Sequence, residues 1–499
     1  MIYLLPLAML VIFWVISQRI LVVTRRSARP LQNPYTWFVS FWVLQFLLLS
    51  LPLLEYETPT TFFTLVYILL SHVAFLVGMT FALVFNKHAR TMDFARLPAR
   101  REIYYVFAGA GLIGQGGLSL SLVMSNTVDL SSRFTREGYE AARYTQLYDG
   151  GYEFGMLGGF SGLFVLMAAL GYIALAYYCF YRGVGARWTR TRSISTVATV
   201  TLALMIAADG IILTGGRSQV FFLLALMTPS FFLGRAVRRK IDGQRPPRTN
   251  VKAIVAGVVA GIALFLGSVS FQQFRSNDRD PRFDLWYAEG ARAHELIAPE
   301  VERSAFVGNL LVQVGYFTSS SNILDFYMRE RDFPGPFYGR YNFPTVYRSL
   351  GRFLPGYDRD FWERDRAELF APLISRGRLG NVWSSLFRDF AADFGLIGAL
   401  IALVVMGWGT QRASDLFFSR PDPFRAILLT LLCFLGAASA LLSLFFIPVF
   451  TWALPLLIVL VVSEWGLGRA RARAAPPRLG FVPATVAISR TRPRRRIGG

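Results

Sequence analysis

The chain has 499 residues, 54% of them hydrophobic, and its mean hydropathy is +0.42. It holds 52 Lys and Arg against 31 Asp and Glu, a formal net charge of +21. This composition excludes an ordinary soluble domain, because apolar runs of roughly 20 residues recur and each could cross a bilayer. Cys179 and Cys433 both fall within such runs, so the sequence predicts neither a disulfide framework nor a zinc site.

Eleven membrane spans are predicted, and their ends are placed to within a few residues. They are residues 1–17, 37–54, 62–85, 104–124, 154–180, 194–213, 218–234, 251–270, 390–408, 426–446 and 449–467. We therefore expect an all-α polytopic membrane protein. Four segments follow from this division: the first eight spans in 1–270, one large loop in 271–389, the last three spans in 390–468 and a tail in 469–499.

Every second connection between the predicted spans is basic. The basic set holds 32 Lys and Arg against 5 Asp and Glu, whereas the other set holds 20 Arg against 23 Asp and Glu. By the positive-inside rule the basic set is cytoplasmic, which places the N-terminus and the large loop in the periplasm and the C-terminus in the cytoplasm. Lysine supplies only three of the 52 basic residues, a bias associated with GC-rich bacterial genomes, so we expect a bacterial inner membrane.

The tail from Arg469 to Gly499 holds nine Arg, no acidic residue and several prolines. A segment of this composition cannot bury a core and is predicted to be disordered. Juxtamembrane basic segments bind anionic lipid, and we favour this interpretation over binding to nucleic acid.

The large loop holds 16 Arg and 16 Asp and Glu and therefore carries no net charge. Its Tyr and Trp residues suit either sugar faces or the membrane surface. His294 and Glu295 are candidate substrate-binding residues within it. Acid-X-acid triplets occur in the loop, but such triplets are frequent by chance, so we predict no metal.

Two arginines are predicted at the periplasmic ends of spans. Arg217 lies in the tight hairpin Gly215-Gly216-Arg217-Ser218, at a helix amino terminus whose free N–H groups favour an anion. Its guanidinium adds a permanent charge and donors suited to phosphate. Arg275 follows the eighth span at the same depth. The alternative for each is an arginine that snorkels to the membrane interface.

The segment that re-enters the membrane has a polar face. At 100° per residue, Asn381, Arg388, Asp389 and Asp393 fall on one side of a helix, and aromatic residues fall on the other. A polar face at this depth must meet protein or water. Asp389 and Asp393 are one turn apart. We therefore expect their repulsion to raise the pKa of one of the two carboxyl groups unless an arginine such as Arg388 pairs with them. A structural ion-pair network is an equally good interpretation of Asp389.

These features resemble the Wzy-type oligosaccharide repeat-unit polymerases, the O-antigen polymerase family. The resemblance covers most of the chain as architecture, with many spans and one large periplasmic loop in the C-terminal half. Two local patterns carry it: Gly215-Gly216-Arg217-Ser218, and Asn381 followed by Asp393-Phe394-Gly395-Leu396-Ile397-Gly398.

The resemblance implies a GT-C-like integral-membrane glycosyltransferase that joins polyprenyl-diphosphate-linked repeat units at the periplasmic face. Arg217 and Arg275 take the role of the family's functional arginines. We expect Asp389 to accept the proton of the acceptor hydroxyl, with His294 or Glu295 as the next choices. Arg388, Asn381 and Asp393 are expected in substrate binding. No cofactor is expected; the implied partners are the lipid-linked oligosaccharide, membrane lipids, a flippase and a chain-length regulator.

Three alternatives remain open. Within enzymes, an O-antigen ligase or a polyprenyl-phosphate-sugar glycosyltransferase would have the same topology. In another class, the protein could be a flippase or transporter of lipid-linked glycans, although transporters place their sites near the membrane midplane. A third alternative is a non-catalytic assembly subunit, which fold analogy alone does not exclude.

Overall fold

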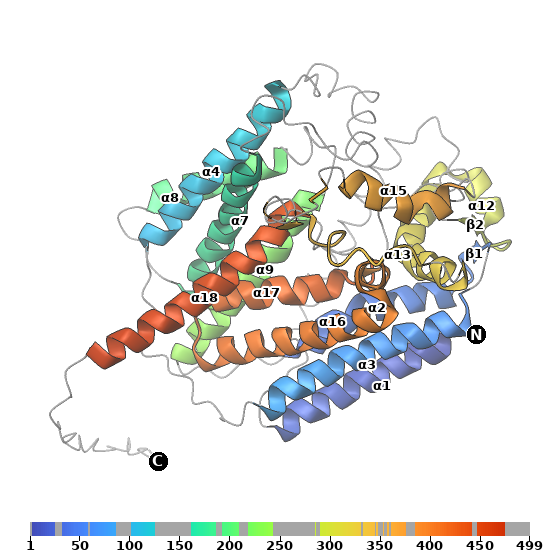
Figure 1. The fold of residues 1–499 in the computed structure, drawn as a ribbon, viewed down its shortest axis with the longest axis horizontal. Coiled ribbons are helices and arrows are strands. Elements are labelled where there is room, and N and C mark those ends of the chain that lie inside the picture. The colour runs from blue at the N-terminus through green and yellow to red at the C-terminus, as the bar shows by residue number, and fades with distance from the viewer. Residues whose placement is uncertain are drawn as a thin grey trace, which may run out of the picture.

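Helices dominate the part of the chain that the computed structural model describes (Figure 1). The described residues are 2–24, 32–57, 60–85, 101–124, 161–185, 192–208, 218–242, 285, 290–330, 333–344, 346–347, 353, 357–358, 361–375, 385–441 and 447–474. The first helices and the first strand are α1 (Leu4–Val23), α2 (Pro34–Ser50), β1 (Leu54–Tyr56), α3 (Phe62–Val84), α4 (Arg101–Met124), α7 (Ser161–Val184), α8 (Arg192–Ala208) and α9 (Ser218–Ile241). The later elements are β2 (Ala291–Ala293), α12 (Ala298–Arg303), α13 (Ala305–Glu330), α15 (Phe361–Ile374), α16 (Leu386–Ser419), α17 (Pro423–Ala438) and α18 (Pro448–Ala474).

Six described helices are long and apolar enough to cross a membrane: α1, α3, α4, α7, α9 and α16. Helices α2, α8, α17 and α18 contain shorter apolar segments. Together these coincide with ten of the predicted spans, and the remaining one, residues 251–270, lies outside the described residues. The prediction of an all-α membrane protein is thereby confirmed.

Local sequence signals set several helix starts. Asn33 accepts a hydrogen bond from the backbone N–H of Tyr35, and Pro34 is the first residue of α2. Asp422 accepts from two backbone N–H groups at the start of α17, where Pro423 again comes first. Both starts satisfy N–H groups that have no partner within the helix, and proline at the first position loses no bond.

Helix α16 lies along α3 at very short range. A Cβ atom at Gly78 would lie 1.9 Å from the carbonyl oxygen of Val404, and one at Gly407 would lie 2.1 Å from that of Phe75. Small residues at such crossings allow the backbones of membrane helices to approach closely. On its other side α16 exposes Ile397, whose relative exposure is 76%, and this apolar face suits lipid.

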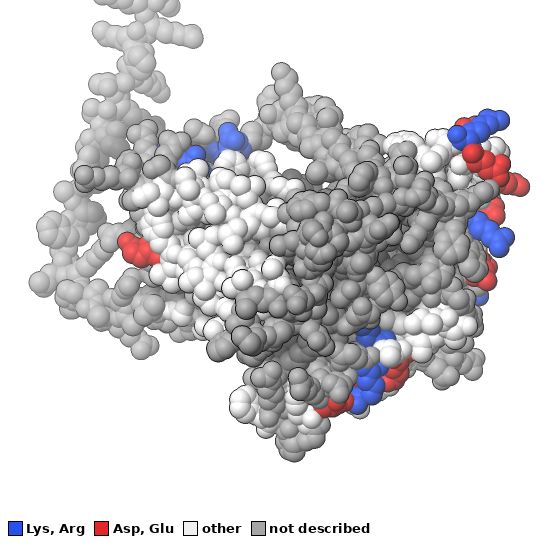
Figure 2. Space-filling model, turned by 90° about the horizontal axis from the view of Figure 1, so that it is seen from above, with Lys and Arg blue, Asp and Glu red and all other residues white. Residues whose placement is uncertain are grey.

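The elements of the large loop cover one end of the group formed by α1, α2, α3, α16 and α17 (Figure 1). Helix α13 packs against α2, α3 and α16. Strand β1, in the connection between α2 and α3, pairs antiparallel with β2 of the loop, with Glu55 opposite Arg292. Figure 2 shows that the charged side chains of the described residues on this face lie in small groups toward its edges. The loop is thus docked onto the membrane helices.

Candidate functional site

The first eight residues of α16, Leu386 to Asp393, form a buried helical segment of their own. Ser385 caps it by accepting a hydrogen bond from the backbone N–H of Arg388. Gly395 ends it, with φ 70° and ψ 169°, a conformation that interrupts the helix and favours glycine. The aromatic Phe387 and the polar Asp393 are both fully buried, so neither face of this segment meets lipid. The start at Leu386 lies before the predicted start at 390 because the loop elements cover this polar stretch.

Arg388 and Asp389 form an ion pair that is completely buried. Arg388 donates to Oδ1 of Asp389 twice, from Nε at 3.0 Å and from Nη2 at 2.7 Å. Nη2 also donates to the hydroxyl of Tyr341 at 3.3 Å. The guanidinium carbon lies 5.6 Å from the ring centre of Tyr327 and 5.5 Å from that of Phe370. Hydrogen bonds and aromatic faces together replace the water that this charge has lost.

One nitrogen of this guanidinium differs from the others. Nη1 of Arg388 is buried and makes no hydrogen bond with any described residue. A buried donor without an acceptor is rare in folded proteins and destabilises them by about 1–3 kcal/mol. Such groups are retained where a ligand or a water supplies the missing partner.

Asp393 holds a turn of the large loop against the helix. Its carboxylate accepts from the backbone N–H of Tyr341 at 3.0 Å and of Asn342 at 2.8 Å, and from Nδ2 of Asn342 at 2.7 Å. The same amide donates to the carbonyl oxygen of Asp389 at 2.9 Å. The loop thereby supplies a donor to the helix near the break at Gly395. Because three donors of the turn bind Asp393, this carboxylate holds the turn in position against the helix.

A second charged group lies on α15. Asp365 is buried, with Arg340 Nε at 3.2 Å and Arg364 Nη2 at 3.5 Å from its carboxylate oxygens. Burial raises the pKa of Asp365 above its usual range, and the two arginines only partly oppose that shift. Burial likewise raises the pKa of Tyr327 to about 12 and holds that of Tyr341 well above its usual value. Both phenols are therefore neutral donors or acceptors around Arg388.

Asp325 ties α13 to the start of α3. Its carboxylate accepts from the backbone N–H of Thr61 at 2.7 Å, from the Thr61 hydroxyl and from the Thr64 hydroxyl at 2.6 Å. Its other oxygen pairs with Nε of Arg329 at 2.6 Å. A carboxylate at a helix amino terminus satisfies free N–H groups and complements the helix dipole. This contact fixes the loop over the helix ends.

The predicted site residues fall into three groups. Arg388, Asp389 and Asp393 come together as described. His294 directly follows β2. Its Nε2 lies 3.6 Å from a carboxylate oxygen of Glu55 in β1, and its Nδ1 accepts a hydrogen bond from the backbone N–H of Leu296. His294 and its neighbour Glu295 therefore belong to the β1–β2 pairing and the entry to α12. Arg217, Arg275 and Asn381 lie outside the described residues.

Several residues of the site were not predicted. Tyr341 and Asn342 act through backbone N–H groups, the Tyr341 hydroxyl and the Asn342 amide. They lie far upstream of Arg388 in the chain, and no spacing in the sequence pairs them with α16. Asp325 could have been suspected, because it is an acid inside the apolar stretch of α13. Across the described ranges, no group of three or more His, Cys, Asp or Glu side chains is arranged to hold a metal ion.

No protein-family model, curated protein or solved structure matches this chain. The chemical argument therefore depends on the residues themselves. They form a buried cation and two carboxylates at the place where a broken membrane helix meets a large docked loop. Such an arrangement has the charged groups needed to hold an anion or to accept a proton.

Proposed function

We propose that the protein is a GT-C-like glycosyltransferase with about 11 spans that polymerises polyprenyl-diphosphate-linked oligosaccharide repeat units. The observation that carries the proposal is the buried pair of Arg388 and Asp389 under the large loop, at the entry of α16 into the membrane. It lies within the second of the two sequence patterns that resemble Wzy-type polymerases. The charge alternation supports a bacterial inner membrane with this loop in the periplasm.

The proposed reaction is a glycosyl transfer between two lipid-linked chains. A hydroxyl of the acceptor unit attacks the anomeric carbon of the donor chain, and the bond from that carbon to the lipid diphosphate breaks. The hydroxyl proton passes to Asp389, and the diphosphate leaves with its bonding electrons. Arg217 and Arg275 would stabilise the charge that develops on the diphosphate, an effect worth several kcal/mol when donors are preorganised.

Proton transfer to Asp389 requires a change in its pairing. Its Oδ1 accepts two N–H groups from Arg388, and a carboxylate oxygen held in this way is a weak proton acceptor. An anionic substrate group that attracted Arg388 would weaken these bonds. We therefore assign Arg388 a role in coupling substrate binding to the basicity of Asp389.

The lipid content of a strain that lacks this gene tests the proposal. We expect single repeat units to accumulate on the polyprenyl carrier at the periplasmic face. Finished polymer that is not transferred would indicate a ligase instead, and units held on the cytoplasmic side would indicate a flippase. Normal polymer in the deletion strain would contradict all three functions: polymerase, ligase and flippase.

A further inference from the structure

One N–H donor of Arg388 makes no hydrogen bond among the described residues. Its Nε and Nη2 donate to Asp389, whereas Nη1 makes no hydrogen bond in the described part of the chain. The residue is fully buried, so bulk water does not supply the missing partner. A guanidinium with a spare donor inside aromatic walls is suited to one oxygen of a phosphate group.

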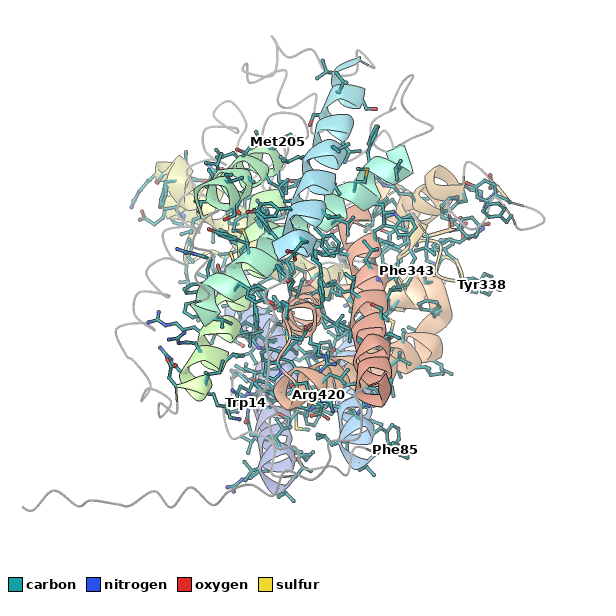
Figure 3. All side chains as sticks on the ribbon, turned by 90° about the vertical axis from the view of Figure 1, so that its left-hand side faces the viewer. Trp14, Phe85, Met205, Tyr338, Phe343 and Arg420 are labelled. Atoms are coloured by element: carbon teal, nitrogen blue, oxygen red, sulfur yellow. The ribbon has the colours of Figure 1, made fainter. Side chains whose placement is uncertain are left out.

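The Tyr338–Asn342 turn covers this arginine and has two contrasting ends. The Tyr341 side chain is buried against Arg388, whereas Tyr338 is 80% exposed. Figure 3 shows Tyr338 at the edge of the molecule, projecting outward beyond Phe343. Tyr338 has φ 53°, which is uncommon for a residue with a side chain and indicates local strain.

The exposed end of the turn lies beside the lipid-facing side of α16. The backbone N–H of Tyr338 donates to the carbonyl oxygen of Asp393 at 2.8 Å, directly before Phe394. Beyond the break, Ile397, Ile401 and Val405 are exposed by 76%, 61% and 60% at four-residue spacing, which is one face of a helix. Tyrosines at the end of such a face are typical of the membrane–water interface.

We propose that the Tyr338–Asn342 turn is a lipid-facing cover over an anion site built on Arg388, whose ligand is a phosphate group carried by a membrane lipid. The inference rests on the proposed function for the kind of lipid, a polyprenyl phosphate or diphosphate. The phosphate lies at the depth of Tyr338, and its chain follows the exposed face of α16. The Tyr341 hydroxyl, which at 3.3 Å makes the longest of the guanidinium hydrogen bonds, gives way to the phosphate.

Ligand binding to the purified full-length protein in phosphatidylcholine nanodiscs tests this site. The probes are polyprenyl phosphate, the matching polyprenol and inorganic phosphate, and the readout is the shift in unfolding temperature with probe concentration. We expect polyprenyl phosphate to bind, polyprenol to bind weakly and inorganic phosphate to bind weakly. The paired substitution Arg388→Met with Asp389→Asn leaves no unpaired charge and should weaken binding about tenfold or more.

Two further variants guard against effects on folding. Tyr338→Ser changes an exposed side chain, and we expect it to weaken binding of the lipid probe but not of inorganic phosphate. Arg329→Met is the control variant, because Arg329 pairs with an aspartate, Asp325, as Arg388 pairs with Asp389. The Arg329→Met variant should bind the lipid probe as the wild type does. Binding can fail here while chain polymerisation succeeds, so the two proposals are tested separately.

Either of two results would overturn the proposal. If the paired Arg388 and Asp389 variant bound polyprenyl phosphate as tightly as the wild type, Arg388 would not be the anion-binding group. If inorganic phosphate bound as tightly as the lipid, and Tyr338→Ser changed neither affinity, the ligand would not be a lipid-borne phosphate.

Discussion

Arg388 and Asp389 are neighbours in the chain, and both side chains are withdrawn from water. Burying a charge is expensive unless a partner and hydrogen bonds replace its hydration. Here the guanidinium and the carboxylate bind each other in place of part of the water that each has lost, and the Tyr341 hydroxyl adds a third polar group. The pair therefore depends on both members.

A double-mutant cycle tests this dependence. Arg388→Met leaves the Asp389 carboxylate buried without its cation, and we expect a loss of about 3–5 kcal/mol in the free energy of unfolding. Replacing both residues, with Asp389→Asn, should cost clearly less than the sum of the two single changes. Chemical unfolding in detergent micelles measures these values. Additive losses would show that the two side chains do not act as a pair.

Asp365 predicts a pH dependence of stability. Its pKa is raised by burial in the folded protein, whereas the unfolded chain has the ordinary value of about 3.9. Between these two values the folded state binds more protons than the unfolded state, so stability falls as pH rises through that window.

The unfolding temperature of the wild type, measured from about pH 4 upward, should show this fall. Asp365→Asn cannot ionise and should remove that part of the slope, while leaving the rest of the pH profile in place. A wild-type slope that Asp365→Asn leaves unchanged would contradict the assignment to this carboxyl group.

Sequence spacing could predict part of this site. Arg388, Asp389 and Asp393 share a helix face, and that regularity is visible in one dimension. The contacts of Tyr341 and Asn342 are not, because the chain path that returns the loop to α16 depends on positive φ at Gly335 and Gly339 and on the packing of α13 and α15. Arg217 and Arg275 remain predictions.

Among the elements, α16 shows what an apolar run leaves unpredicted. Hydropathy predicted a span at 390–408, and the helix found there extends from Leu386 to Ser419 with a break at Gly395. Hydropathy marks only the apolar length of a helix. It does not reveal polar turns that other protein elements cover, such as the segment that holds Arg388.

The crossing of α3 and α16 gives a prediction with a control two residues away. Gly407→Ala would place a Cβ 2.1 Å from the carbonyl oxygen of Phe75, so the helices must separate, and we expect a loss of about 1–3 kcal/mol. A Cβ at Gly409 meets nothing within 4 Å, so Gly409→Ala should be neutral or stabilising by up to about 1 kcal/mol. Thermal unfolding followed by circular dichroism compares the two. Equal effects would contradict the close crossing.

For the whole molecule, the span pattern predicted the class of protein, because it follows directly from the physics of a bilayer. The orientation derived from the charge alternation remains a prediction. The docking of the large loop was not predictable in this way. It depends on contacts such as the one from Asp325 to Thr61, between residues distant in the chain. These contacts place the Arg388 and Asp389 pair beneath the loop, where the proposed transfer would occur.

The proposed polymerase activity can be measured with the purified protein in proteoliposomes supplied with lipid-linked repeat units. We expect the wild type to form a ladder of chain lengths, and Arg217→Ala and Arg275→Ala each to leave mainly single units. Arg303→Ala, at an exposed position of α12, should behave as the wild type does. The account would be contradicted if both arginine variants gave ladders of unchanged length and yield.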